Sequence, residues 1–348
     1  MNPQMNPQIS VIIPAYNRVD MLVHVVESVL AQTVPVLEVI VIDDGSHDET
    51  STLMPRYIAE RPGWGGRVRY FRQENQGQSA ALNHGISKAR GEWLGFVAHD
   101  DLWLPWKLEW QLRAIQKYPD CQLCFTDAWF MNNPHMKQTL FQFYGSNLTG
   151  PMGIVSDPVR LVVGPHPMWT QTVIARADAV QRAGNYDAFL RYSEDHDFLF
   201  RMALLTKFCY VSIPMVLIDR SPADVRHVGE GQNWHKVEYC LQMDQHRFEK
   251  QLSLSEGLPA DVRKTIRASL RSIHSHWATC HLRNNNYPMA RESVRTAARY
   301  DLTPSIAMKR LLINAAPEMA RKIFVARDED GKPRHDRTSW QAADQVSE

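Results

Sequence analysis

The N-terminal third of the chain alternates short apolar runs with amphipathic stretches. Four runs rich in β-branched and aromatic residues predict buried strands, at residues 9–13, 38–42, 67–71 and 93–97. Apolar residues recur at helical spacing in two of the stretches between them, residues 18–31 and 79–89. This alternation predicts an α/β fold with a doubly wound, mostly parallel sheet flanked by helices. In such sheets, ligands bind beyond the carboxyl ends of the strands.

The rest of the chain is first less regular and then helical. Further strands are predicted at 122–130, 170–175 and 208–218, and a helix is predicted to open near Glu194 and Asp195. From about 234 to 325 the apolar spacing is helical throughout. Residues 277–304 resemble one tetratricopeptide unit, and a single unit cannot stack into a solenoid, so we expect a helical hairpin packed on the α/β domain.

Composition narrows the classes of function. The 348 residues carry a formal net charge of +1, which disfavours sequence-independent nucleic-acid binding because that binding needs many cations against phosphate. No window approaches 18 uninterrupted apolar residues, so no membrane-spanning helix is predicted. Five cysteines do not make a disulfide framework in a chain of this length. Residues 1–8 lack a signal-peptide pattern, so we expect a disordered lead and a location in the reducing cytoplasm.

Polar clusters follow the first two predicted strands. Residues 14–18 place an aromatic ring and main-chain N–H groups where a base and an anion can bind, although Asn17 can equally cap the next helix. Asp43 and Asp44 follow the second strand and can accept hydrogen bonds from a nucleobase or ribose. The alternative is an Asx turn closed by Gly45, which suits Asp43 better than Asp44.

Two more acidic clusters lie further along the chain. His99, Asp100 and Asp101 follow the fourth strand, and their hard oxygen atoms suit Mg²⁺ or Mn²⁺, although the carboxylates can also cap a helix. Residues 193–197 open a helix and include three acids. Acids at a helix N-terminus complement the dipole, but three in four residues exceed that need.

In this order, the segments IIPAYNR, VIDDGS and ENQGQSAALNHGI, the strand end at 99–101 and the downstream Glu-Asp pair resemble the family 2 glycosyltransferases of the GT-A fold. The resemblance covers residues 9–220. It implies a Rossmann-like sheet and inverting sugar transfer from a nucleotide diphosphate donor, by preference a UDP-sugar, with Mn²⁺ or Mg²⁺. It also implies a catalytic domain at 9–225 with a nucleotide-binding half (9–105) and an acceptor half (106–225). A helical region at 226–327 and a disordered tail at 328–348 would follow.

The resemblance assigns roles residue by residue. Asp195 would be the general base, with Glu194 orienting the acceptor or the helix, and Asp101 would be the main metal ligand. The nucleotide-sugar would contact Pro14, Ala15, Tyr16, Arg18, Asp44, Gln78, Asn83, His99 and Asp100. His99 departs from the acidic residue that is commonest at its position. Ser221 stands where many members have a histidine, so that Arg220 would contact phosphate and His227 could be an extra metal ligand or an exposed loop residue.

The acceptor would be a saccharide or a lipid-linked saccharide, in a pathway such as bacterial surface polysaccharide synthesis. Trp169 and Gln171 border the expected acceptor site, where Trp169 either stacks on a sugar ring or packs in the core. Two other functions compete with this interpretation. A sugar nucleotidyltransferase would have a Gly-rich basic phosphate loop, which IIPAYNR lacks. An inactive sugar- or nucleotide-binding protein would be expected to lose the acidic positions, which are present.

The C-terminal residues 304–325 combine apolar side chains with four cations, Lys309, Arg310, Arg321 and Lys322. This pattern favours a helical pair packed on the catalytic domain, with Pro317 starting the second helix. A basic amphipathic segment on the inner face of a membrane is the alternative, which limits membrane contact to peripheral association. A homodimer through these helices is a further expectation.

Overall fold

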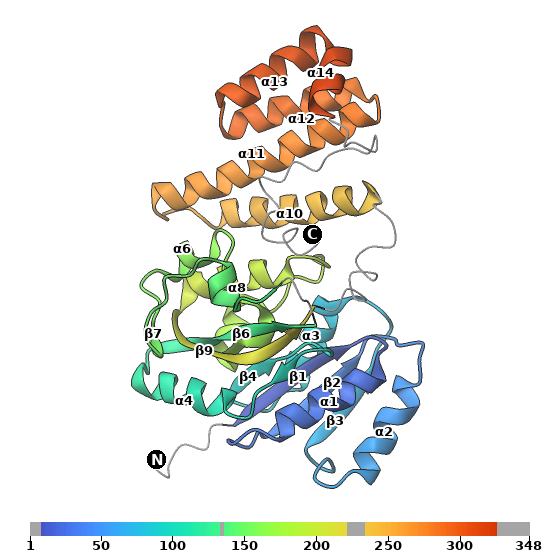
Figure 1. Ribbon diagram of the computed structural model, residues 1–348, viewed down its shortest axis with the longest axis vertical. Coiled ribbons are helices and arrows are strands. Elements are labelled where there is room, and N and C mark those ends of the chain that lie inside the picture. Colours follow the sequence, from blue (N-terminus) through green and yellow to red (C-terminus); the bar gives the residue numbers. More distant parts are fainter. Residues whose placement is uncertain (1–7, 133–135, 221–233, 326–348) are drawn as a thin grey trace. The chain divides into compact units, whose positions relative to one another are not determined.

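The computed structural model describes residues 8–132, 136–220 and 234–325, with side chains from residue 237 onward in the last range. The chain divides into two compact units, residues 1–228 and 229–348 (Figure 1). The first unit contains the sheet and its helices, and the second contains helices in the part that the structure describes.

In the first unit, one mixed sheet of nine strands forms from the described residues. Its order is β3 (Val68–Arg72), β2 (Glu38–Asp43), β1 (Ile9–Ala15), β4 (Trp93–Phe96), β8 (Val173–Arg176), β6 (Cys121–Met131), β9 (Lys207–Asp219) and β5 (Leu102–Trp103). The short strand β7 (Met152–Ile154) also pairs with β9. Strands β3, β2, β1 and β4 are parallel, whereas β8 is antiparallel to both of its neighbours. The carboxyl ends of the parallel strands therefore meet at one edge.

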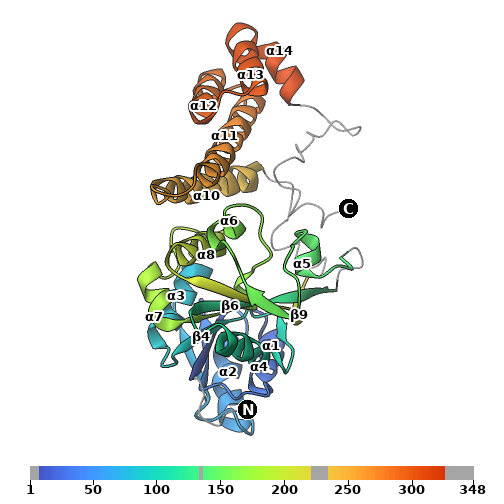
Figure 2. The same cartoon turned by 90° about the vertical axis from the view of Figure 1, so that its left-hand side faces the viewer.

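Helices cover both faces of this sheet (Figure 2). On one face, α3 (Gln78–Lys88) brings Gly85 against Ile12, and α8 (Glu194–Leu205) packs Phe198 on Phe96, the neighbour of Ile12 across β1 and β4. On the other face lie α1 (Val19–Leu30) and α4 (Lys107–Lys117), which are linked by a bond from the Leu108 N–H to Gln32. The strands between them are buried on both faces, because successive side chains point into opposite helical layers.

The structure confirms the predicted fold class and most of the predicted elements. The seven predicted strands and the helix that opens at Glu194 are present, with bounds shifted by at most three residues. The sequence pattern did not predict α2 (Thr50–Glu60), which contains Pro55, or the short strands β5 and β7. The remaining elements are the short helices α5 (Leu140–Phe143), α6 (Pro158–Val162) and α7 (Ala177–Ala183), and a 3₁₀ turn at Thr170–Thr172. Three-residue strands carry too little periodicity to be recognised.

The second unit confirms the helical pattern. It contains α10 (Trp234–Ser253), α11 (Ala260–Arg283), α12 (Tyr287–Tyr300), α13 (Pro304–Ala315) and α14 (Pro317–Phe324). Helices α11 and α12 form the predicted hairpin, and Pro317 begins the last helix as predicted. Its core includes Ala278, Leu282, Val294, Ile306 and Ile313. In the described ranges, no helix is both long and apolar enough to cross a membrane.

Candidate active site

Hydrogen bonds join the loops that follow β1 and β2. The N–H of Asn17 donates to Ser46 Oγ at 2.8 Å, and the N–H of His47 donates to Asn17 Oδ1 at 2.9 Å. Asn17 and Arg18 both have positive φ angles, 58° and 64°, so the chain makes a sharp left-handed turn before α1. Asn17 is therefore not the N-cap of α1. That position belongs to Arg18, and Asp48 from the next loop accepts from the N–H of Val19.

The two aspartates at the end of β2 have different surroundings. Asp43 is fully buried, accepts from the N–H of Ser46 at 2.8 Å and from the hydroxyl of Tyr70, and is paired with Arg72. These contacts give Asp43 a structural role in the turn, although its carboxylate bonds to the N–H three residues on rather than two residues on as in an Asx turn. Gly45 closes the turn with φ 79°, where an added Cβ would lie 2.9 Å from the N–H of Asn75.

Asp44 organises the loop between β3 and α3. Its carboxylate accepts from Gln73 Nε2 at 2.8 Å, from the N–H of Gln76 at 2.9 Å and from the N–H of Gly77 at 2.8 Å. This fixed carboxylate lies where the ends of β1, β2 and β3 meet, beside exposed Tyr16 and exposed Gln78. Pro14 and Ala15 form the buried end of β1. Contact of these residues with a nucleotide stays a prediction.

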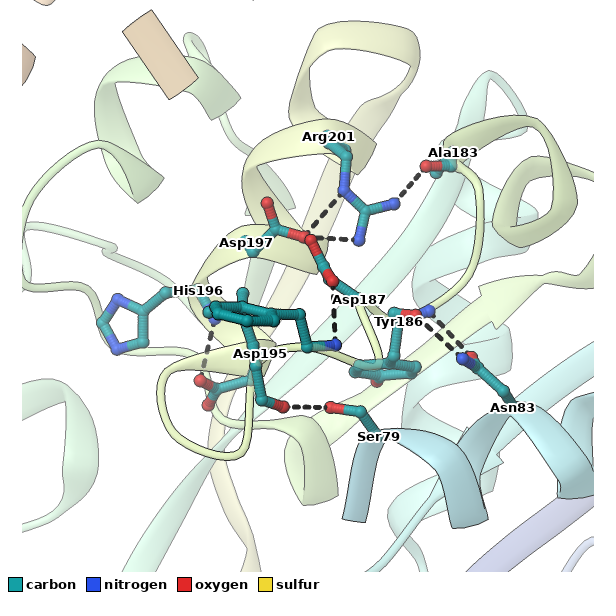
Figure 3. A network of polar contacts seen from close by, with 11 residues as sticks. Ser79, Asn83, Ala183, Tyr186, Asp187, Asp195, His196, Asp197 and Arg201 are labelled. Carbon is teal, nitrogen blue, oxygen red and sulfur yellow. Dashed lines mark hydrogen bonds and ion pairs between the residues drawn. The ribbon is translucent and has the colours of Figure 1, made fainter. Parts of the chain in front are cut away.

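Asn83 lies one helical turn further along α3 and does not face open solvent. Its amide donates to the carbonyl of Tyr186 at 2.8 Å and accepts from the N–H of Tyr186 at 2.9 Å (Figure 3). Ser79 likewise donates to the carbonyl of Leu190 at 2.6 Å. The start of α3 is thus bound to the loop before α8, and any contact of Asn83 with the donor sugar stays a prediction.

Asp101 is the buried member of the cluster that follows β4. It is 2% exposed, while His99 and Asp100 are half-buried. One of its oxygens accepts from the N–H of Asp219 at 2.9 Å, and no other hydrogen bond to it forms within the described ranges. Burial, and then the negative charge of Asp100, raise the pKa of Asp101 well above its ordinary value. A cation beside this carboxylate would restore its charge.

Arg220 supplies one such cation from the end of β9, and its charge acts on Asp101. Its guanidinium lies 4.4 Å from the ring centre of Trp169, a cation–π arrangement. Trp169 also packs on Phe130, and its indole N–H lies 3.4 Å from the hydroxyl of Tyr144. Trp169 is therefore half-buried, with an aromatic partner on one side and the charged Arg220 on the other. Stacking of its ring on a sugar stays a prediction.

Tyr144 connects this group to the acidic cluster of α8. Burial raises the pKa of Tyr144, and the charge of Asp195 raises it further while Arg220 lowers it. The charges of both Asp195 and Arg220 thus act on one hydroxyl. Residues 101, 144, 169, 195 and 220, far apart in sequence, lie in one connected neighbourhood.

The start of α8 is held by several contacts (Figure 3). Ser193 has a positive φ of 58°, and the N–H of His196 donates to Asp195 Oδ1 at 2.8 Å. Asp197 is fully buried and pairs with Arg201 at 2.7 Å, and Arg201 also donates to the carbonyl of Ala183. Of the three acids, Asp197 therefore has a structural role, whereas Glu194 and Asp195 lie at the half-buried start of the helix.

Glu194 and Asp195 influence each other electrostatically. Burial, and then the neighbouring charge of Asp195, raise the pKa of Glu194 to about 8. Glu194 therefore holds its proton at a higher pH than an ordinary glutamate. Such a pair of acids at the edge of an α/β sheet is a candidate for acid–base chemistry.

Two residues that the sequence assigned to the site are not seen to join it in the described structure. The carbonyl of Gln171 accepts a hydrogen bond from the indole N–H of Trp103 at 3.0 Å. The main chain of Gln171 therefore stabilises the segment that follows Asp101. His227 lies outside the described residues. Within the ranges that the structure describes, no three His, Cys, Asp or Glu side chains are grouped to hold a metal.

The sequence did not point to Gln73, Tyr144 or Tyr186. Gln73 is an uncharged residue just before the ENQGQSAALNHGI segment, and Tyr144 lies in a segment without clear periodicity. Tyr186 is buried and stacks on Phe198 at 4.3 Å, a packing contact that a single sequence cannot reveal.

The chain is similar to known glycosyltransferases in sequence and in fold. Residues 10–182 match the family model described as Glycosyl transferase family 2. An uncharacterized glycosyltransferase of Rickettsia typhi is 39% identical over 112 residues, 32% of this chain and 33% of that protein. Chondroitin synthase of Escherichia coli is 38% identical over 111 residues, 32% of this chain and 16% of that protein. The matches thus span about a third or less of these relatives.

Solved structures share the fold at low sequence identity. TarS 1–349 of S. aureus, solved in complex with UDP-GlcNAc, superposes with a TM-score of 0.52 at 17% identity, covering 84% of this chain and 90% of that one. Mannosyltransferase PcManGT of Pyrobaculum calidifontis, in complex with GDP-Man and Mn²⁺, gives 0.52 at 18%, covering 92% and 85%.

Proposed function

Because residues 10–182 of this chain belong to glycosyl transferase family 2, we propose that it moves a glycosyl group from a UDP-sugar to a hydroxyl group, with inversion at the anomeric carbon. The acceptor is a saccharide or a lipid-linked saccharide in this proposal. The observation that carries it is the connected group of Asp101, Arg220, Trp169, Tyr144 and Asp195 at the carboxyl edge of the sheet.

Asp195 acts as the general base in this proposal. An acceptor hydroxyl is a poor nucleophile until a carboxylate takes its proton as the new bond forms. The raised pKa of Glu194 makes this neighbour a weaker competitor for negative charge beside Asp195. The main-chain N–H of His196 orients Asp195.

Negative charge grows on the leaving nucleoside diphosphate during transfer. In this proposal the positive charge of Arg220 stabilises it. The guanidinium is held over Trp169 and beside Asp101, so it is already placed before the donor binds. Attack from the face opposite the diphosphate inverts the anomeric configuration. A second acid is unnecessary, because a diphosphate leaves without being protonated, unlike the sugar oxygen in hydrolysis.

A divalent ion fits this site only in part. Among the residues that the structure describes, one oxygen of Asp101 accepts no hydrogen bond and no three side chains are grouped to hold a metal, so most ligands would come from the diphosphate. Asp101 would hold Mn²⁺ or Mg²⁺, with Asp100 and His99 nearby and His227 as an extra candidate. The ion would supply charge neutralisation at the diphosphate.

The donor base contacts Asp44 and Tyr16 in this proposal, and ribose or phosphate contacts Asp100. UDP is the nucleotide of the donor in this proposal, which the S. aureus neighbour solved with UDP-GlcNAc supports; the P. calidifontis neighbour, with the same TM-score, was solved with GDP-Man. The chondroitin synthase relative supports a saccharide acceptor. A location in the cytoplasm is part of this proposal and rests on the expectation from the sequence.

A donor screen tests the proposal. Melting temperatures of the full chain are measured with UDP-, GDP- and dTDP-sugars, each with and without Mn²⁺. We expect a rise with UDP-sugars that is larger when Mn²⁺ is present. A rise with a sugar 1-phosphate plus a nucleoside triphosphate, and none with any nucleotide-sugar, would instead support a nucleotidyltransferase.

A further inference from the structure

Helix α13 buries a lysine on its inner side and exposes large apolar residues on its outer side. Its buried side includes Lys309, which is 7% exposed and donates to Ser275 O at 2.7 Å, Ser275 Oγ at 3.0 Å and Thr279 Oγ1 at 2.7 Å. Its outer side includes Met308 and Leu311, 62% and 67% exposed. An amphipathic helix on a water-soluble surface normally has the opposite arrangement.

The outer apolar residues of α13 form a stripe. Positions 307, 308, 311 and 315 fall on one side of a helix, and they are occupied by Ala307, Met308, Leu311 and Ala315, all exposed. The next helix, α14, adds exposed Met319 and Ile323 at a spacing of four residues. The inner positions Ile306 and Ile313 already pack in the core of the second unit. Burial within the second unit therefore accounts for only some of the apolar residues in this segment.

The helices next to this stripe are basic. Residues 234–325 contain fifteen Lys and Arg against eight Asp and Glu, although the whole chain has a net charge of only +1. Arg291, Arg295 and Arg299 are spaced four apart along one side of α12, which packs against α13. These three and Arg310 make no ion pair with any carboxylate in the described ranges, unlike Arg271, which pairs with Asp301.

We infer that this surface, the apolar stripe of α13 with the basic side of α12, docks on an anionic lipid membrane. Exposed apolar side chains enter the boundary between headgroups and acyl chains, while arginines remain at the level of anionic headgroups. The phosphates of a nucleic acid would pair with the arginines, but the exposed methionine and leucine side chains would have no apolar surface to contact. A second copy of the chain would cover the apolar stripe but would bring two sets of unpaired arginines together.

Vesicle co-sedimentation of the full chain tests this inference without reference to transferase activity. Vesicles of phosphatidylcholine alone are compared with vesicles that also contain phosphatidylglycerol, at about 0.1 M and about 1 M salt. We expect binding to the anionic vesicles at low salt and little binding at high salt. Absence of binding to anionic vesicles at low salt would overturn the inference.

Paired variants separate the two parts of the surface. Arg295→Gln with Arg299→Gln should weaken binding to anionic vesicles at least about tenfold, since each basic residue near such a surface contributes roughly a fivefold factor. Met308→Ser with Leu311→Ser should weaken it by about tenfold. Leu205→Ser, on the first unit and 49% exposed, is the matched control and should bind like the wild type.

Two outcomes contradict the inference even if the wild type binds vesicles. Equal binding by both double variants and the control would place the contact elsewhere on the chain. A dimer seen by analytical ultracentrifugation, and converted to monomer by Met308→Ser with Leu311→Ser, would identify the stripe as an interface between copies. The exposure of all the substituted residues makes correct folding the expected result, which melting temperatures verify.

Discussion

Glu194→Gln should remove a pH dependence of stability that the wild-type protein shows. The pKa of Glu194 is raised from its ordinary value of 4.5 to about 8 in the folded protein. The folded state therefore binds more protons than the unfolded state between these values, so the free energy of unfolding falls as pH rises from 4.5 to 8. Glutamine has no proton to lose, and the variant should lack this fall.

The size of the effect follows from the pKa. A change from 4.5 to about 8 corresponds to roughly 5 kcal/mol of unfolding free energy if it is fully expressed. Because Glu194 is partly exposed and its charge is screened by water, we expect about 2 kcal/mol. For a unit of this size, that corresponds to a difference in melting temperature of roughly 4–8 °C.

The assay is a set of melting curves at pH 5, 6.5 and 8 for the wild type and Glu194→Gln. The variant should melt close to the wild type at pH 5 and above it at pH 8. Glu74→Gln, at an exposed glutamate, is the control and should follow the wild type at every pH. A constant difference between the wild type and Glu194→Gln across the range would show that Glu194 ionises like an ordinary surface acid, and the electrostatic argument for the pair would be wrong.

Three further predictions concern the site. Asp195→Asn should lower the transfer rate by roughly 10²–10⁴ with donor binding unchanged in calorimetry, and a loss under tenfold would remove Asp195 as the base. Asp101→Ala should weaken UDP binding only when Mn²⁺ is present, because it removes the metal ligand. Asp44→Ala should weaken uridine binding with or without Mn²⁺. Identical titrations for the two variants would contradict the assignment of Asp101 to the metal and Asp44 to the base. Trp169→Leu should weaken UDP binding roughly fivefold by releasing Arg220, and Trp169→Phe should restore most of it; equal losses would mean that the ring acts only by packing.

The sequence by itself determined the class of fold and the ends of the strands. Apolar β-branched runs such as residues 9–13 and 38–42 need both faces of the strand to be covered, which two layers of helices provide. Their alternation with helical patterns therefore already predicts the parallel half of the sheet. The acidic clusters at 43–44 and 99–101 follow parallel strands, so their positions at one edge follow from the parallel topology, whereas residues 194–195 open a helix that follows another helix and their position depends on the tertiary structure.

Only the tertiary structure decided what each polar residue does. Asp43 and Asp44 are neighbours in sequence, yet one closes a buried turn and the other holds the loop before α3, because successive side chains at a strand end point in opposite directions. Asp197 is as acidic as Asp195, but its pairing with Arg201 makes it structural. The contacts of Arg220 with Trp169, and of Lys309 with Ser275, join residues from distant segments. Such contacts depend on packing between elements, which the local pattern of a single sequence does not specify.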